Sequence, residues 1–262
     1  MIEVEGLTKR YGATAVVDDV TVTVPEGSLT AVIGPNGAGK STLLSMIARL
    51  MKPDAGSVRI AGLDVASTPG EMLARRMSIL RQENHITARL TVRDLVGFGR
   101  FPHSGGRPGP EDARLVAAAL EALDLEALGD RFLDELSGGQ RQRAFVAMTL
   151  AQDADYMLFD EPLASLDIRH AISMMDLLRD VCRAKGKTVV LVLHDINIAA
   201  NFADNVIAMK DGRIAAVGGT ADVMSSEKLT GLYGLPITVE RNRGTFVIDY
   251  FRAHRRTDDL SA

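Results

Sequence analysis

A glycine-rich stretch near the N-terminus constrains the fold more than any other part of the chain. It reads Gly34-Pro35-Asn36-Gly37-Ala38-Gly39-Lys40-Ser41 and fits the phosphate-binding loop (P-loop) pattern G-x-x-x-x-G-K-[ST]. The apolar residues 29–33 before it predict a buried strand, and residues 42–50 after it predict a helix. Because this strand–loop–helix context is the one that the pattern needs, the sequence predicts a phosphate site here.

The residue types of the P-loop suit phosphate chemistry. Its glycines let backbone N–H groups turn inward without a Cβ in the way, and the positive end of the following helix dipole attracts phosphate oxygens. We expect Lys40 to reach the β- and γ-phosphates and the Ser41 hydroxyl, with Thr42 beside it, to ligate Mg²⁺. A glycine-rich turn that merely starts a helix is the alternative, and the flanking strand and helix disfavour it.

The composition limits the class of protein to which the chain can belong. Its 262 residues suffice for one large domain, and 46% hydrophobic with 24% charged residues is ordinary for a soluble globular protein. The net charge of −4 disfavours a general nucleic-acid binder, so we expect no nucleic-acid partner.

The single Cys182 excludes an intrachain disulfide. We find no signal-peptide pattern and no run of 18 apolar residues, and so expect a cytosolic chain that does not span a membrane.

Strand-like and helix-like patterns alternate along the chain, which predicts a mostly parallel sheet flanked by helices. The predicted strands cover residues 2–5, 21–24, 29–33, 57–60, 77–80, 156–159, 188–193, 205–209, 213–217, 237–240 and 246–250. The predicted helices cover residues 42–50, 92–98, 111–123, 125–129, 141–151 and 168–184. Asp211-Gly212 predicts a hairpin turn. The last helix has an apolar face that we interpret as core, made of Ile168, Ile172, Met175, Leu178 and Cys182.

The character of the sequence changes from about residue 91, where helical patterns follow one another around a Gly/Pro-rich stretch at 102–110. We interpret this block as a helical insertion between the elements of the nucleotide site. Phe98, Phe101 and His103 lie at a predicted exposed corner, where loop packing and contact with a partner are equally good interpretations.

Two carboxylates end an apolar strand. Asp160 and Glu161 follow residues 156–159, and the carboxyl end of a strand in a parallel sheet is the usual place of a ligand crevice. There Asp160 can hold Mg²⁺ through a water, and Glu161 can polarise or deprotonate an attacking water. A merely solvated strand end fits poorly, because adjacent carboxylates repel each other unless a cation is near.

Two further features suit phosphate, although each alone is commonly structural. Ser137 is a natural helix N-cap, and Gly138 and Gly139 after it expose backbone N–H groups at a predicted helix start. They predict a second anion site without a lysine. His194 follows the strand predicted at 188–193, where a neutral imidazole could hydrogen-bond a γ-phosphate.

Together these motifs resemble the ATP-binding subunit of an ABC transporter, from Met1 to about Val239. Residues 136–140, Leu-Ser-Gly-Gly-Gln, match the signature of that family letter for letter. The resemblance implies an α/β fold of the ABC ATPase type: a P-loop NTPase core with a mostly parallel sheet flanked by helices, an N-terminal antiparallel β-subdomain and a helical insertion at about 88–150. The ATP-binding domain would span residues 1–240, followed by a C-terminal strand and polar tail at 241–262.

The resemblance also implies roles for individual residues, with ATP and Mg²⁺ as ligands. Catalysis would involve Glu161, His194 as the γ-phosphate switch, Lys40, and Gln82, which would link Mg²⁺ and the water to membrane subunits. Residues 165–167 would form a dimer-bridging loop. The metal would be held by Ser41, Gln82 and Asp160. The nucleotide would be bound by Tyr11, predicted in the loop after the first strand and stacking on adenine, and by Gly34, Pro35, Asn36, Gly37, Ala38, Gly39, Lys40, Ser41, Thr42, Ser137, Gly138, Gly139, Gln140 and Asp167.

A head-to-tail homodimer is a further implication. The P-loop of one copy and Ser137 with Gly139 of the other would sandwich one ATP, which accounts for a second anion site that one chain cannot bring to its own nucleotide. Closing on ATP and opening after hydrolysis would be a two-state change biased by the ligand.

The kind of transporter follows only from resemblance. A chain with one nucleotide site and no membrane segment resembles importer subunits, which are peripheral at the cytoplasmic face of the cell membrane and work with a polytopic permease and a substrate-binding protein. Segments 91–103, 160–170 and 193–197 resemble the ferric-siderophore, haem and cobalamin branch, and most of all iron–siderophore importers. Residues 83–103 would receive a short helix of the permease. The tail after Arg241 could touch lipid headgroups, but a solvated, frayed tail is the better interpretation.

Other functions remain open at this stage. Haem or cobalamin could be the cargo instead of a siderophore. A soluble ABC protein acting on ribosomes or DNA, and a regulatory ATP binder without turnover, are alternatives from other classes. The absence of a second nucleotide domain disfavours the first of these, and the presence of Glu161 and His194 disfavours the second.

Overall fold

The computed structural model describes residues 1–82, 86 and 88–251. Its centre, within that part of the chain, is a six-stranded sheet in the order β10-β9-β3-β8-β7-β6. Its strands are β3 (Leu29–Ile33), β6 (Met77–Leu80), β7 (Tyr156–Asp160), β8 (Thr188–Val192), β9 (Asn205–Lys210) and β10 (Arg213–Gly219). All neighbours pair in parallel except β9 and β10, which form the hairpin predicted at Asp211-Gly212. Strands β3, β7 and β8 are buried throughout, which is why they are continuous apolar runs.

An antiparallel sheet in the order β2-β1-β4-β5 lies beside the N-terminus, as the resemblance implied. Its strands are β1 (Ile2–Tyr11), β2 (Thr14–Val24), β4 (Ala55–Ile60) and β5 (Leu63–Asp64). The predicted bounds 2–5 and 21–24 were too short, and Tyr11 ends a strand rather than lying in a loop. Register shifts interrupt the pairing of β1 with β2 at three places, and such bulges break the alternation by which a strand is recognised.

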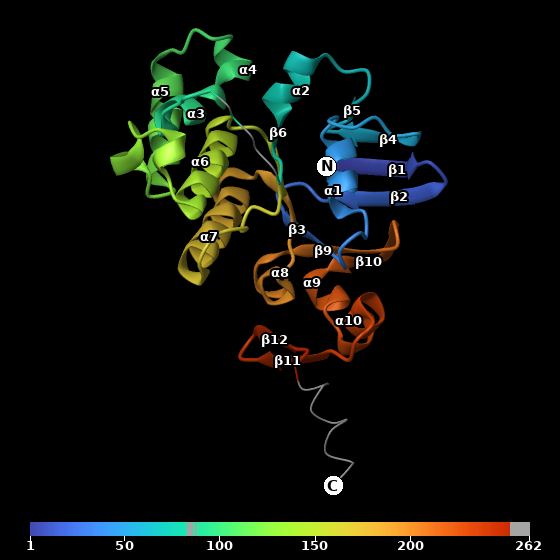
Figure 1. The fold of residues 1–262 in the computed structure, drawn as a ribbon. Helices are drawn as coiled ribbons and strands as arrows, with labels where there is room; N and C mark the ends of the chain where they lie inside the picture. The colour runs from blue at the N-terminus through green and yellow to red at the C-terminus, as the bar shows by residue number, and fades with distance from the viewer. Residues whose placement is uncertain (83–85, 87, 252–262) are drawn as a thin grey trace.

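Helices of the core pack around the central sheet (Figure 1). They are α1 (Lys40–Ile47), α2 (Gly70–Arg76), α7 (Ile168–Lys185), α8 (Ile196–Phe202), α9 (Thr220–Val223) and α10 (Ser226–Tyr233). Met175, Leu178 and Cys182 on α7 are buried as predicted, but Ile168 is 84% exposed and Ile172 is 38% exposed. The prediction that these two isoleucines are core was therefore wrong, because the first turns of α7 border an open cavity. Within residues 1–82, 86 and 88–251, no helix is both long and apolar enough to cross a membrane.

The helical insertion forms a separate group of elements at the upper left of Figure 1. It comprises α3 (Val92–Phe98), α4 (Phe101–Ser104), α5 (Pro110–Glu121), the 3₁₀ turns η1 (Glu126–Leu128) and η2 (Leu133–Glu135), and α6 (Gly138–Ala151). The predicted helix at 125–129 is only a 3₁₀ turn, because Asp124 before it adopts a left-handed conformation and Gly129 ends it. The stretch 102–110 contains most of α4, and α6 begins at Gly138 instead of residue 141. Phe98 and Phe101 are exposed, as predicted.

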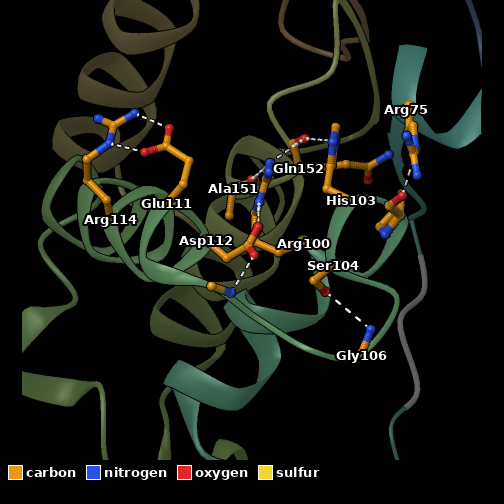
Figure 2. Close-up of polar contacts among 12 residues, drawn as sticks. Arg75, Arg100, His103, Ser104, Gly106, Glu111, Asp112, Arg114, Ala151 and Gln152 are labelled. Atoms are coloured by element: carbon orange, nitrogen blue, oxygen red, sulfur yellow. Dashed lines mark hydrogen bonds and ion pairs between the residues drawn. The ribbon is translucent and has the colours of Figure 1, made fainter.

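A polar network fixes the insertion internally (Figure 2). The buried guanidinium of Arg100 donates to Asp112 at 2.8 Å and to the carbonyls of Ala151 and Gln152, which end α6. The ring of His103 lies 3.0 Å from the carbonyl of Gln152. Arg100 thereby joins the C-terminus of α6 to the first turn of α5, which satisfies carbonyl groups that a helix end leaves without partners.

The C-terminal residues form a two-stranded hairpin, β11 (Thr238–Asn242) and β12 (Thr245–Asp249), at the bottom of Figure 1. Its two-residue turn, Arg243-Gly244, has positive φ at both positions, as hairpin turns of this length prefer. The strands lie within one or two residues of the predicted 237–240 and 246–250. The predicted frayed tail at 252–262 and Glu83 at the start of the predicted permease-binding surface lie outside the described residues.

Candidate functional site

The P-loop between β3 and α1 adopts a backbone path that needs glycine. Gly34 has a φ of 145° and Gly39 a φ of 94°. A Cβ on Gly34 would clash with the carbonyl of Met209, and one on Gly39 with the carbonyl of Val16. The two glycines therefore permit both the left-handed turns and the close approach of neighbouring backbone, which together shape a cradle for an anion.

Lys40 begins α1 and is held beneath the loop. Its ammonium donates to the carbonyls of Gly34 at 2.8 Å and Pro35 at 3.0 Å. The residue is only 6% exposed, and burial lowers the pKa of Lys40, while the carboxylates of Glu161 and Asp160 oppose that shift. The loop thus holds a partly desolvated positive charge where phosphate oxygens would lie.

Ser41 and Asp160 meet across the crevice. The Ser41 hydroxyl donates to the carboxylate of Asp160 at 2.8 Å. Asp160 ends β7 and is 6% exposed; burial raises its pKa, and the hydrogen bond from Ser41 opposes this rise. A hydroxyl and a carboxylate at this spacing suit Mg²⁺, which binds one or two protein oxygens together with phosphate oxygens. No group of three or more acidic, histidine or cysteine side chains in the described residues offers a metal cage made by protein alone.

Glu161 stands at the centre of a short row of polar side chains. Gln82, after β6, donates to one of its carboxylate oxygens at 3.0 Å, and His194, after β8, lies 2.6 Å from the other. Glu161 has a φ of 55°, a left-handed conformation that costs a non-glycine residue about 1 kcal/mol. Strained residues of this kind gather at functional sites, and here the strain directs Glu161 toward the crevice.

Lys40, Ser41, Gln82, Glu161 and His194 line one cavity of about 490 Å³. They come from the carboxyl ends of β3, β6, β7 and β8, which parallel pairing brings to one edge of the sheet. The residues lining it are Val16, Asn36, Gly37, Ala38, Gly39, Lys40, Ser41, Thr42, Gln82, Glu161 and His194. Val16 was not predicted, because it lies in the part of β2 that the sequence pattern did not reveal.

The predicted second anion site lies elsewhere on the molecule. The Ser137 hydroxyl accepts from the amide of Gln140, and the side chain of Gln140 accepts in turn from the amide of Ser137. A second cavity of about 450 Å³ adjoins this helix start, lined by Ser137, Gly138, Gly139, Gln140, Arg143, Ser165, Leu166, Asp167 and His170. In the described part of the chain it shares no lining residue with the P-loop cavity. The two predicted phosphate-binding segments therefore line two separate cavities.

Tyr11 does not line the P-loop cavity. It is 54% exposed, and its hydroxyl lies 3.4 Å from the sulfur of Met51. Gly34 and Pro35 likewise lie outside the lining residues but contact Lys40 through their carbonyls. The structure thus brings together the predicted P-loop, Gln82, Asp160, Glu161 and His194 in one group, and Ser137 to Gln140 with Asp167 in another.

Comparisons with known proteins agree with this geometry. The family model described as ABC transporter matches residues 17–164. The petrobactin import ATP-binding protein YclP of Bacillus subtilis (strain 168) is 45% identical over 240 residues, which cover 92% of this chain and 95% of that protein. The ferric enterobactin transport ATP-binding protein FepC of Escherichia coli (strain K12) is 42% identical over 233 residues, 88% of this chain and 86% of that protein.

Solved structures give the same result. The chain matches a transporter described as a metal-chelate type ABC transporter in an inward-facing conformation with a TM-score of 0.80, at 27% identity over 94% of this chain and 95% of that one. It matches the dimeric structure of MJ0796, a bacterial ABC transporter cassette, with a TM-score of 0.77, at 31% identity over 84% of this chain and 99% of that one. The family match at 17–164 spans the P-loop, the signature helix and the carboxylate pair. With these relatives, it shows that the chain belongs to the ABC transporter family as an ATP-binding subunit.

Proposed function

We propose that this chain is the ATP-hydrolysing subunit of an importer for iron–siderophore complexes, and that it works beneath a separate permease at the cytoplasmic face of the cell membrane. The observation that carries the ATPase is the cavity in which the P-loop, Glu161 and His194 meet, with Asp160 hydrogen-bonded to Ser41 of that loop. The cargo class rests on the relatives, which are named for petrobactin import and ferric enterobactin transport, and on a structural neighbour of the metal-chelate type.

In the proposed reaction Glu161 accepts a proton from the attacking water. Its two carboxylate oxygens are already oriented by Gln82 and His194, so the base is held in place before a nucleotide arrives. Lys40 would leave the loop carbonyls to bind the β- and γ-phosphates, and His194 would hydrogen-bond the γ-phosphate. Ser41 and Asp160, with Gln82, would hold Mg²⁺, whose charge neutralises the phosphates.

The active form in this proposal is a head-to-tail homodimer. Two half-sites on one chain that share no lining residue make sense if each is completed by a second copy. In that arrangement the amides at Gly138 and Gly139 contact the γ-phosphate held by the partner, with Ser137, Gln140 and the Asp167 loop beside them. The related cassette MJ0796 has been solved as a dimer, which supports this form. A substrate-binding protein would deliver the cargo to the permease from the other side of the membrane.

Phosphate release from purified protein tests the ATPase. We expect Mg²⁺-dependent turnover, and a loss of 10² or more in rate for Glu161→Gln, since a positioned base contributes about that factor. Glu161→Gln should still bind ATP and should accumulate as a dimer. Glu121→Gln, which changes an exposed glutamate on α5, is the matched control and should keep the full rate. Normal turnover by Glu161→Gln would contradict the assignment of the base.

Growth of a deletion strain tests the cargo. We expect loss of growth on ferric siderophores as the sole iron source, with growth on haem iron and on cobalamin-dependent medium retained. The opposite pattern would assign haem or cobalamin as the cargo. Copurification of the tagged chain with a polytopic permease separates an importer from a soluble ABC protein, which would instead copurify with ribosomes or DNA.

A further inference from the structure

Two asparagines on α8 have an unusual arrangement of partners. Asn197 and Asn201 lie four residues apart and therefore one above the other on the same face of the helix. The helix begins at Ile196, directly after His194 and the N-cap Asp195. Asn197, in the first turn of α8, is thus three residues along the chain from His194, whose imidazole contacts Glu161.

Each asparagine holds one residue of β12 by two hydrogen bonds. Asn197 donates to the carbonyl of Ile248 at 3.2 Å and accepts from its amide at 2.9 Å. Asn201 donates to the carbonyl of Phe246 at 2.9 Å and accepts from its amide at 2.8 Å. Both side-chain amides therefore use a donor and an acceptor at once, as a peptide group of a neighbouring strand would.

The fit between helix and strand follows from their repeats. Residues four apart on an α-helix are separated by about 6 Å along the axis. Residues two apart on a strand are separated by about 6.8 Å and point their backbone groups to the same edge. The spacing of Asn197 and Asn201 thus matches that of Phe246 and Ile248, so the face of α8 takes the place of a third strand beside β12.

The other edge of the hairpin is fixed to α10. The amide of Val239 on β11 donates to the hydroxyl of Ser226, the first residue of α10, at 2.9 Å. At the far end of α10, Tyr233 is held against the P-loop: burial raises its pKa to about 12, and a hydrogen bond from the backbone amide of Gly34 opposes that rise. The C-terminal segment therefore reaches from the start of the P-loop to the helix that follows His194.

Apolar packing also connects the C-terminal hairpin to α8. The side chains of Phe246 and Ile248 are 9% and 4% exposed and belong to the main hydrophobic core, as do Ala199 and Ala200 of α8. The hairpin lies directly against α8, as Figure 1 shows at the bottom of the molecule. It is a packed element joined to the helix by directional hydrogen bonds, so displacing it would require the first turn of α8 to move.

We propose that Asn197 and Asn201 are positioning residues for ATP hydrolysis: by clamping β12 they fix the first turns of α8 and so hold His194 against Glu161. The inference rests on the proposed function, because it assigns a task to His194 in hydrolysis. It gives the C-terminal hairpin a role in the reaction although no residue of the hairpin lines the P-loop cavity.

A double-mutant cycle tests the clamp. Asn197→Ala with Asn201→Ala should lower kcat about tenfold and leave the KM for ATP unchanged, because a misplaced group far from the chemistry costs rate in this range. In the His194→Ala background the same double substitution should change the residual single-turnover rate less than about twofold, because its effect passes through the missing imidazole. Asn242→Ala, an exposed asparagine on β11 outside the clamp, is the matched control and should keep the wild-type rate.

The outcomes separate the two proposals. If wild type does not hydrolyse ATP, or if His194→Ala hydrolyses it at the wild-type rate, the proposed function fails. If wild type hydrolyses ATP and His194→Ala is slower than wild type, but the double variant has wild-type kcat or loses the same factor in both backgrounds, the clamp alone is overturned. Should the double variant not fold, Asn197→Asp replaces it, because this change keeps the acceptor and loses the donor. It must lower kcat, by less than tenfold and with unchanged ATP binding, for the inference to stand.

Discussion

Two glycine-rich segments of this chain each lead into a helix, and they differ in how the first backbone N–H groups are satisfied. Helix α1 begins after Gly39 of the P-loop, which has a φ of 94° and provides no side-chain cap. Helix α6 begins after Ser137, which forms a reciprocal capping box with Gln140. The first helix start leaves its donors for a ligand, whereas the second is already capped by its own side chains.

The charged groups near the two segments differ as well. Lys40 and Asp160 are buried at the P-loop. Burial lowers the pKa of Lys40 and raises the pKa of Asp160, and both shifts favour the neutral form of the side chain. None of the described residues that line the second cavity, beside Ser137 at the start of α6, is buried. The P-loop cavity is therefore preorganised for charge at some cost to the nucleotide-free protein. In the proposed dimer, by contrast, the signature binds phosphate only when the second copy lies opposite it.

Mixing two inactive variants gives the strongest test of this comparison. Lys40→Ala removes the P-loop cation, and Gly138→Asp adds a carboxylate at the signature that would repel phosphate; each alone should lower hydrolysis 10² or more. A 1:1 mixture should recover about a quarter of wild-type activity, because half of the dimers then contain one intact site. Phosphate release measures the recovery. A mixture that forms mixed dimers and stays inactive would contradict the completion of each site by the partner copy.

Replacing one glycine of each segment by alanine should destabilise the protein at the P-loop but not at the signature. Gly39→Ala places a Cβ against the Val16 carbonyl at a left-handed φ, and we expect a loss of about 2 kcal/mol or more in the free energy of unfolding. At Gly138 the nearest atom to a new Cβ is the Ser165 Cβ at 3.6 Å, an ordinary contact, so Gly138→Ala should change stability by less than about 0.5 kcal/mol. Denaturant unfolding measures both, and equal losses would remove the distinction.

The P-loop, the carboxylate pair and the strands around them were predictable because their signals are local. Residues 29–33, 77–80 and 92–98 match the observed elements, since buried parallel strands and capped helices leave continuous or periodic patterns. Bulges hid the length of β1 and β2, and with it the contribution of Val16 to the cavity. The exposure of Ile168 and the clamp at Asn197 depend on what lies beyond the helix, which no pattern within α7 or α8 records.

Asp160 provides a test of the cost of preorganisation. Burial raises the pKa of Asp160 in the folded protein above its unfolded value. The contribution of Asp160 to the free energy of unfolding is therefore greatest at low pH, and it falls as pH rises from about 4 through the folded pKa. Asp160→Asn, which can still accept from Ser41, should therefore raise the melting temperature of the nucleotide-free protein at neutral pH by about 2–4 °C. The gain should shrink toward zero below pH 4, where wild type is protonated too. A variant less stable than wild type at pH 7 would contradict a burial cost.

Tyr11 gives the smallest expected effect and concerns a third surface that belongs to neither segment. Because it is 54% exposed and lies outside the P-loop cavity, any role in ATP binding must come from stacking on the base alone. Tyr11→Ala should raise the KM for ATP about threefold to tenfold at unchanged kcat, since stacking of a base on an aromatic ring is worth about 1 kcal/mol or more. Tyr11→Phe keeps the ring and should bind like wild type, and neither change should alter the unfolding midpoint. An unchanged KM in Tyr11→Ala would leave the adenine without this aromatic contact, and the phosphates would then carry the affinity through the P-loop by themselves.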